Sequence, residues 1–346
     1  MNILQVTPRY PPQSGGVETH VKEISERLAD RGHNVTVLTA DAGGEGSRRE
    51  RRNGVQIKRY RSIAPNESIH LCPQIAIAVR QSNASVVHAH NYHSLPLFFA
   101  AAGVNDRKFI ITPHYHGGSA DQTRDRLLSV YHQFGRWAVR QADEVIAVSN
   151  WESEQLASDF EVKASVIPNG LDIGRFRNAA SFDHTQPYLL TVGRLEQYKG
   201  IQHVIRVLPE FPEYHLLVAG SGPYRTELKQ LTTEVGVENR VMFLGYVDDD
   251  LLPQLYAGAE VYVSLSRFEA YGMTVPEALA SGTPCVVLEK GALNDWSSNR
   301  GVVGVRTASP GSVQNAIFTA MNDEIGKIEF PTWGEVTSEL EVLYHE

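Results

Sequence analysis

Cysteine is scarce in this chain of 346 residues, since only Cys72 and Cys285 occur and neither has a second cysteine at metal-ligand spacing. This excludes a disulfide framework and gives no support to a thiolate zinc site. Long apolar runs are also missing, because no uninterrupted stretch reaches the roughly 18 residues that span a bilayer. The first residues lack a basic segment followed by an apolar one, so we expect no signal peptide and a cytoplasmic protein.

An excess of positive charge is absent as well. The formal net charge is -8, which argues against broad nucleic-acid binding. Residues 1–172 carry 19 Lys and Arg against 18 Asp and Glu, whereas residues 173–346 carry 13 against 22, so the two halves offer partners different surfaces. With 42% hydrophobic residues the chain is long enough for about two domains, which excludes a fibre and a disordered tail.

Short runs rich in valine and isoleucine alternate with helical periodicity in the N-terminal half. Residues 3–6 and 34–38 predict strands, and residues 17–29 predict a helix that Gly32 closes. Further strands are predicted at residues 85–89, 109–112 and 144–148. This order is typical of a parallel, doubly wound sheet.

The same alternation restarts after a loop-like stretch at residues 168–187. Strands are predicted at residues 188–192, 215–219, 241–244, 260–264 and 285–288. Residues 332–344 carry apolar side chains at helical spacing and predict a terminal helix. The expected fold is α/β, with two Rossmann-like, doubly wound parallel-sheet domains facing a central cleft at the carboxyl ends of their strands.

Adjacent glycines, Gly15 and Gly16, end the loop after the first predicted strand, at the start of a predicted helix. Without side chains there, an anion could approach the backbone N–H groups at the positive end of the helix. The pattern is not the G-x-G-x-x-G dinucleotide fingerprint, so NAD binding has little support. A tight turn without a ligand is the alternative interpretation.

Two cations follow the strand predicted at residues 188–192, namely Arg194 and Lys199. At the carboxyl end of a strand they would suit a departing diphosphate, although a solvated loop would carry the same residues. A second glycine-containing loop, residues 219–223, follows the next strand at the same expected edge.

The most specific pattern is a pair of glutamates, Glu269 in a loop and Glu277 beside Pro276 at a helix start. A glutamate there can simply complement the helix dipole. However, two carboxylates that flank a run of backbone amides form a better site for sugar hydroxyls than for a metal.

Taken in chain order, these motifs resemble glycosyltransferase family 4, whose members are retaining enzymes of the GT-B fold. The resemblance rests on Gly-Gly-Val-Glu at 15–18, Ile-Pro-Asn-Gly-Leu-Asp at 167–172, Val-Gly-Arg at 192–194 with Lys-Gly at 199–200, and the two glutamates at 269 and 277. It implies an acceptor-binding domain at 1–172, a linker at 173–187, a nucleotide-sugar-binding domain at 188–330, and a helix at 331–346 that packs on the first domain.

The resemblance also assigns roles to individual residues. Gly16, beside Gly15, would hold the donor's diphosphate together with Arg194 and Lys199, while Glu277 would bind the ribose hydroxyls. Glu269 would face the transferred sugar, as would the residues of the following loop, Ala270, Tyr271, Gly272, Met273 and Thr274. His114 would lie near the reacting carbon, with His116 as the fallback, and Val247 would meet the nucleobase.

The implied reaction moves a hexose or N-acetylhexosamine from a nucleotide-diphosphate sugar to a glycan, lipid-linked or small-molecule acceptor, with retention of anomeric configuration. No metal and no cofactor are expected, because cations and helix N-termini would stabilise the leaving group. The sequence Asp248-Asp249-Asp250 looks like a metal motif, but it falls where the family has a solvated loop. A sugar-nucleotide epimerase, a phosphorylase and a non-catalytic nucleotide-sugar-binding subunit are the alternatives.

Two segments depart from the family pattern. Ala270-Tyr271-Gly272 replaces the usual Gly-Phe-Gly, and residues 290–296 replace a Gly-Gly-x-x-Glu segment, so the donor sugar cannot be inferred by analogy.

The expected acceptor domain has two basic segments. A basic, aromatic helical stretch, residues 124–140, could rest on an anionic bilayer at the inner face of the plasma membrane, or could bury one face in its own domain. The basic run at residues 48–52 could assist at a membrane or form a solvated loop.

Overall fold

The computed structural model describes residues 1–41, 48–63, 69–118, 122–326 and 328–346, apart from the side chains of residues 122–130. The chain divides into two compact units. The first contains residues Met1–Gly170 and Pro331–Glu346, and the second contains Leu171–Phe330. Residues 173–187 thus lie within the second unit, where they include helix α6 (Ile173–Arg177).

The first unit is built on an eight-stranded sheet with the order β3-β4-β2-β1-β5-β6-β7-β8. Its strands are β1 (Asn2–Thr7), β2 (Asn34–Thr39), β3 (Arg48–Arg52), β4 (Val55–Arg59), β5 (Val86–His90), β6 (Lys108–Thr112), β7 (Glu144–Ala147) and β8 (Ser165–Val166). Its helices are α1 (Gly16–Asp30), α2 (Gln74–Gln81), α3 (Leu95–Gly103), α4 (Gln122–Arg140), α5 (Asn150–Phe160) and α13 (Trp333–His345). Every strand pair is parallel except β3 and β4.

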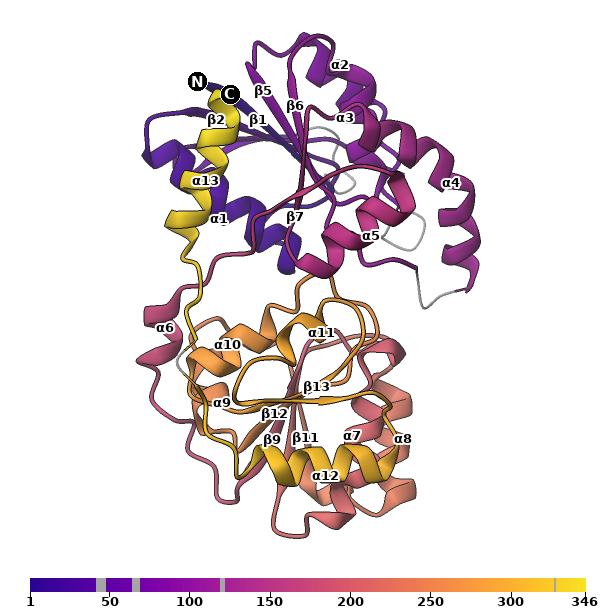
Figure 1. Ribbon diagram of the computed structural model, residues 1–346, viewed down its shortest axis with the longest axis vertical. Coiled ribbons are helices and arrows are strands. Elements are labelled where there is room, and N and C mark those ends of the chain that lie inside the picture. Colours follow the sequence, from indigo (N-terminus) through magenta and orange to yellow (C-terminus); the bar gives the residue numbers. More distant parts are fainter. Residues whose placement is uncertain (42–47, 64–68, 119–121, 327) are drawn as a thin grey trace. The chain divides into compact units, whose positions relative to one another are not determined.

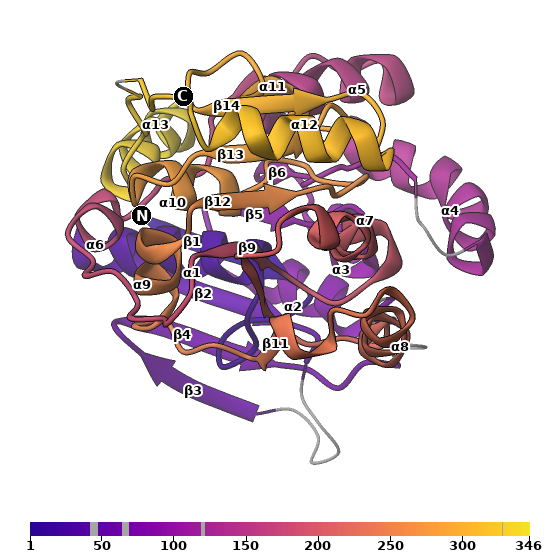
Figure 2. The same ribbon diagram turned by 90° about the horizontal axis from the view of Figure 1, so that it is seen from below.

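The basic run at residues 48–52 is strand β3, so the expectation of a solvated loop there is wrong. The strand pairs antiparallel with β4 at the edge of the sheet, as Figure 2 shows. Its one acidic residue, Glu50, pairs with Arg59 of β4 at 2.7 Å, and Arg59 also pairs with Asp41 at 2.7 Å. Backbone pairing and this ion-pair network, rather than apolar alternation, hold the edge strand.

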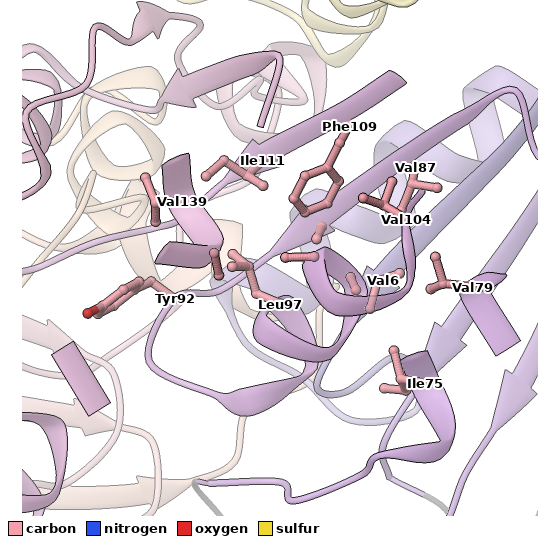
Figure 3. Close-up of a cluster of buried hydrophobic side chains, with 14 of the residues drawn as sticks. Val6, Ile75, Val79, Val87, Tyr92, Leu97, Val104, Phe109, Ile111 and Val139 are labelled. Carbon is pink, nitrogen blue, oxygen red and sulfur yellow. The ribbon is translucent and has the colours of Figure 1, made fainter. Parts of the chain in front are cut away.

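The core of the first unit lies between the sheet and its helices. Val6, Val87, Phe109 and Ile111 extend from the strands and pack against the helices (Figure 3). The helical side of this cluster includes Ile75, Val79, Leu97 and Val139. The β-branched and aromatic composition of these strands therefore reflects burial in a parallel sheet.

The C-terminal helix α13 belongs to the first unit, as expected, and runs beside α1 (Figure 1). Thr332 and Glu335 form a capping box at its start. Trp333, Val336 and Leu340 are buried along one face, which accounts for the helical spacing of the apolar residues. At its far end the hydroxyl of Tyr344 accepts a hydrogen bond from Gln5 Nε2 at 3.2 Å.

The second unit has a six-stranded, all-parallel sheet with the order β11-β10-β9-β12-β13-β14. Its strands are β9 (Tyr188–Val192), β10 (His215–Ala219), β11 (Val241–Gly245), β12 (Val261–Ser264), β13 (Cys285–Leu288) and β14 (Val302–Val305). The helices, besides α6, are α7 (Ile201–Val207), α8 (Arg225–Val235), α9 (Leu252–Gly258), α10 (Thr274–Ala280), α11 (Leu293–Trp296) and α12 (Pro310–Ala320). Two separate apolar clusters, each with strand residues, make this sheet doubly wound.

Most predicted strands have the expected positions, and three of them, β9, β10 and β13, have the predicted bounds. Strands β3, β4, β8 and β14 are not predicted by the sequence pattern. Among the described residues, none of the helices combines the length and apolar character that crossing a bilayer requires.

Candidate functional site

Three loops at the carboxyl end of the second sheet are joined by backbone hydrogen bonds. The amide of Gly193, after β9, donates to Ala219 O, at the end of β10, at 2.9 Å. The amide of Gly220 donates to Gly245 O, at the end of β11, at 2.7 Å. Gly220 has φ 133°, and a Cβ there would lie 1.9 Å from the carbonyl oxygen of Gly193. Gly220 is therefore required for the close approach of these loops, because a side chain at this position would collide with the Gly193 carbonyl. The contact holds in place the start of the loop in which Arg194 follows β9.

Lys199 and Glu269 form an ion pair at this edge. Lys199 Nζ lies 2.5 Å from Glu269 Oε1, and both side chains are 21% exposed. Burial disfavours the charged lysine, but the carboxylate of Glu269 outweighs this effect and raises the pKa of Lys199 above its ordinary value. Lys199 is consequently a fixed positive charge, and a ligand that binds here meets both members of the pair.

Arg194 is the more accessible cation, with its side chain 56% exposed. Its Nε lies 3.2 Å from Glu196 in the same loop. An exposed pair of this kind contributes little to stability, so the guanidinium is available to an anionic ligand.

The loop between the two glutamates turns at Gly272, which has φ 82°. Its carbonyl accepts a hydrogen bond from Val275 N at 2.9 Å, and α10 begins at Thr274. Thr274 Oγ1 accepts from the hydroxyl of Tyr262, on β12, at 2.6 Å. Ala270, Tyr271, Gly272 and Met273 thus form the turn that enters the helix bearing Glu277.

The segment that departs from the family pattern supports this loop. Trp296 Nε1 donates to Tyr271 O at 2.7 Å, and Ala292 N donates to Glu269 O at 3.0 Å. Trp296 and Ala292 therefore hold the backbone of the turn at two points. This supporting role of residues 290–296 is not predictable from the sequence, because no local pattern reveals which backbone carbonyl an indole will meet.

Glu277 is held by a buried tyrosine that the sequence analysis did not select. The hydroxyl of Tyr256, a fully buried residue of α9, donates to Glu277 Oε2 at 2.9 Å. Burial raises the pKa of Glu277 to about 7, although the Tyr256 hydroxyl and Arg175 oppose the shift. This carboxyl group therefore changes its charge near neutral pH.

Val247 is half-buried just after β11, and the following Asp248, Asp249 and Asp250 are exposed. Asp248 O accepts from Leu251 N and Leu252 N at 3.0 and 3.1 Å, so these aspartates lie at the start of α9. The three carboxylates form no metal-ligand cluster within the described residues.

In the first unit, the amide groups of Gly15 and Gly16 lie at the start of α1, as predicted. A Cβ at Gly15 would lie 2.3 Å from Glu18 Oε2, whereas a Cβ at Gly16 would meet nothing within 4 Å. Burial raises the pKa of Glu18, although Arg9, whose Nε lies 3.2 Å away, opposes the shift. Gly16 thus has open space beside it at the helix start.

His114 follows β6 with φ 47°, and its side chain is only 7% exposed. The next amide, Tyr115 N, donates to Glu152 Oε1 at 2.5 Å, while Val148 N donates to Glu152 Oε2 at 2.7 Å. Glu152 is fully buried on α5, so it connects the loops after β6 and β7. The fallback candidate, His116, stacks on His93 with ring centroids 3.8 Å apart.

Family comparisons cover nearly the whole chain. Residues 14–175 match a family described as Glycosyltransferase Family 4, and residues 172–327 match one described as Glycosyl transferases group 1. An uncharacterized glycosyltransferase of Methanocaldococcus jannaschii is 32% identical, in an alignment of 326 residues that covers 85% of this chain and 82% of that protein.

Three further relatives have a named activity or a bound ligand. The glycogen synthase of Mycobacterium tuberculosis is 30% identical, with 89% of this chain and 82% of the relative covered. The alpha-monoglucosyldiacylglycerol synthase of Streptococcus pneumoniae is 26% identical, with 87% and 74% covered. The structure of Anabaena HepE in complex with UDP-glucose has a TM-score of 0.74 at 20% identity and covers 99% of this chain and 95% of that one, which shows the shared fold.

Proposed function

This chain belongs to glycosyltransferase family 4, the group 1 glycosyl transferases, and on this premise we propose which of its residues carry the transfer of a sugar from a nucleotide-diphosphate donor. The family activity itself, a retaining transfer to a glycan or lipid acceptor, requires a leaving diphosphate to be stabilised.

One observation carries the proposal: cations and carboxylates gather at the carboxyl ends of two adjacent strands, β9 and β12. Arg194 and Lys199 follow β9, while Glu269 follows β12 and pairs with Lys199 at 2.5 Å. The two cations would bind the diphosphate and balance the charge that grows as the sugar–phosphate bond breaks. Glu269 would then keep Lys199 charged and oriented while its second oxygen meets a sugar hydroxyl.

The second unit would supply further contacts of the donor. Glu277 would accept hydrogen bonds from the ribose hydroxyls, Val247 would lie near the base, and the amides of residues 270–274 would meet the sugar and its phosphate. In the first unit, the Gly16 amide would bind a phosphate oxygen and His114 would lie near the reacting carbon. Because cations and amides supply the stabilisation, no metal is needed to hold the diphosphate.

We propose UDP-glucose as the first donor to test, because it is bound in the structure of Anabaena HepE. The names of the relatives include both a glycogen synthase and a diacylglycerol glucosyltransferase, so both a glycan and a lipid acceptor are candidates. In helix α4, Ala138 and Val139 are buried in the unit's own core, whereas Phe134 and Trp137 are 57% and 43% exposed. These exposed rings support peripheral contact with an anionic membrane at the cytoplasmic face, where Arg136 and Arg140 keep a net positive charge although both pair with Glu161.

The test is nucleotide release from UDP-, GDP-, dTDP- and ADP-sugars, with glucan, with anionic lipid vesicles and with neither. Release that requires one acceptor, with retained configuration in the product, is expected. Lys199→Ala should lower kcat/KM by about 100-fold, since one charge that stabilises the leaving group is lost. Lys229→Ala, at an exposed lysine of α8, is the matched control and should leave the rate unchanged.

Three results would contradict the proposal. An isomerised sugar nucleotide without transfer would indicate an epimerase, and tight donor binding without turnover under any condition would indicate a binding subunit. Equal rates for the Lys199 and Lys229 variants would remove Lys199 from the site.

The pH dependence of donor binding should report on Glu277. Because the pKa of its carboxyl group is about 7, the group is protonated below this pH and accepts stronger, charge-assisted hydrogen bonds above it. We expect the Kd of the intact nucleotide sugar, measured by calorimetry without acceptor, to fall about tenfold between pH 6 and 8, which corresponds to the added strength of a charged hydrogen bond.

Two variants make this test specific. Glu277→Gln should flatten the pH profile, and Tyr256→Phe should move its midpoint to higher pH, because the hydroxyl that lowers the pKa of Glu277 is lost. A wild-type Kd that is constant over this range would exclude Glu277 as the titrating ligand of the donor.

A further inference from the structure

Three buried histidines from distant parts of the sequence meet in the first unit. His20 lies on α1, His90 ends β5, and His114 follows β6, the strand that pairs with β5. Their side chains are 2%, 0% and 7% exposed. The ring centroid of His20 lies 5.4 Å from that of His90 and 4.8 Å from that of His114. We call this group the histidine triad.

Hydrogen bonds fix the outer nitrogen of two of these rings. His20 Nδ1 lies 2.7 Å from Asn169 Oδ1, and His90 Nε2 lies 2.8 Å from Gln5 Oε1. Since both partners are carbonyl oxygens, each of these ring nitrogens carries the proton and donates it. Gln5 Nε2 in turn donates to the hydroxyl of Tyr344 at 3.2 Å, which sets the orientation of that amide.

The inner nitrogens of His20 and His90 are therefore lone pairs. His20 Nε2, His90 Nδ1 and His114 Nε2 are all buried and have no hydrogen-bond partner within the described structure. One such atom in each of three adjacent rings is unusual, because buried polar atoms are nearly always paired. Three unpartnered imidazole nitrogens that converge, two of them fixed as acceptors, suit a bound cation.

Neutral imidazole, with one ring nitrogen protonated and the other free, is the form in which histidine binds a metal ion.

We infer that the histidine triad is a binding site for a divalent transition-metal cation of the zinc class, held by His20 Nε2, His90 Nδ1 and His114 Nε2. The ligand atoms lie within 4.8 Å of one another. Bonds of about 2.0–2.1 Å in a tetrahedral site place nitrogens roughly 3.4 Å apart, so small side-chain movements close the triad on an ion.

The chemistry of the ligands selects the metal. Among the described residues no carboxylate or thiol joins the three rings, so the site suits Zn²⁺, Co²⁺, Ni²⁺ or Cu²⁺ rather than Mg²⁺ or Ca²⁺. Asn169 and Gln5 accept the outer N–H groups, as the second shell of a histidine metal site does. Three protein ligands leave a further coordination position for water or a small ligand.

This inference does not rest on the proposed function. The donor's diphosphate is assigned to cations and amides, and the triad's ion would not hold it. The shared residue is His114, whose Nε2 the ion would occupy. Metal binding is measured without donor. A chain that binds no metal would therefore not affect the proposed role of Lys199, and an active Lys199→Ala variant would not contradict the metal site.

The experiment uses the full chain, stripped with a chelator and titrated with Co²⁺ and then Zn²⁺. We expect one Co²⁺ per chain with the intense visible absorption of a low-coordinate ion, displaced by one Zn²⁺, and a rise in Tm with Zn²⁺. His20→Ala and His90→Ala should each weaken Co²⁺ binding at least 100-fold. Asn169→Ala, which keeps all three ligands, should weaken it 10- to 100-fold.

The matched control is His184→Ala, which removes a histidine from the pair that His184 forms with His215 in the second unit, with ring nitrogens 3.0 Å apart. It should leave the visible spectrum and the stoichiometry unchanged. If one variant fails to fold, the other variants and the number of Co²⁺ ions bound per wild-type chain still test the metal site. A wild-type chain that takes up no Co²⁺, or that loses uptake only in His184→Ala, overturns the inference and leaves a buried water as the partner of the three nitrogens.

Discussion

Gly16→Ala should lower kcat/KM for the donor by about 1,000-fold while the protein becomes slightly more stable. The two effects have separate causes. A methyl group would stand in the open space beside the amide that we propose to bind a phosphate oxygen, and losing one such contact costs up to about a thousandfold in rate. Alanine is also the better helix former by about 1 kcal/mol, and no atom lies within 4 Å to oppose its Cβ.

The natural control is Gly311→Ala. Gly311 lies in the first turn of α12 in the second unit, and a Cβ at this position would also meet nothing within 4 Å, but the proposal gives it no ligand. Thermal unfolding and steady-state kinetics on both variants should show a similar gain in Tm and a loss of rate only for Gly16→Ala. Full activity of Gly16→Ala would remove this helix start from the donor site.

Glu152→Ala should lower the free energy of unfolding by about 2–5 kcal/mol, because the amides of Tyr115 and Val148 would both lose the buried carboxyl oxygens to which they donate. Glu152→Gln should also destabilise, since its NH₂ group would face a backbone donor in place of one carboxyl oxygen. Denaturant unfolding followed by far-UV circular dichroism measures both changes.

Burial raises the pKa of Glu152 to about 8, although the two amides oppose the shift. The folded state therefore keeps a proton that the unfolded state loses near pH 4.5, and this group's contribution to stability falls as pH rises from about 5 to 8. Glu152→Ala should remove that slope. Glu154→Ala, at an exposed glutamate of the same helix, is the control and should change neither the slope nor the stability by more than about 0.5 kcal/mol.

The same residue shows why part of the candidate site escaped the sequence analysis. Glu152 has no motif around it, and its importance comes from two amides in other loops. Tyr256 and Trp296 are similar cases, because each acts on a loop residue far along the chain, Glu277 and Tyr271 respectively. The residues at 269–277 were found because a local turn and a helix start produce a spacing that can be read directly.

The sequence by itself determined the two α/β units, most of their strands, the loops after strands that carry Arg194 and Glu269, and the helix starts that carry Gly16 and Glu277. It could do so because buried parallel strands demand continuous apolar runs, and because loops that approach a ligand or a helix start demand particular residues. Only the tertiary structure decided that residues 48–52 form an edge strand and that His20, His90 and His114 meet. Residues 48–52 could not be recognised as a strand because edge pairing uses backbone groups that every residue has. The three histidines meet because of the order of strands in the sheet, which places the ends of β5 and β6 side by side and is not encoded in spacing along the chain.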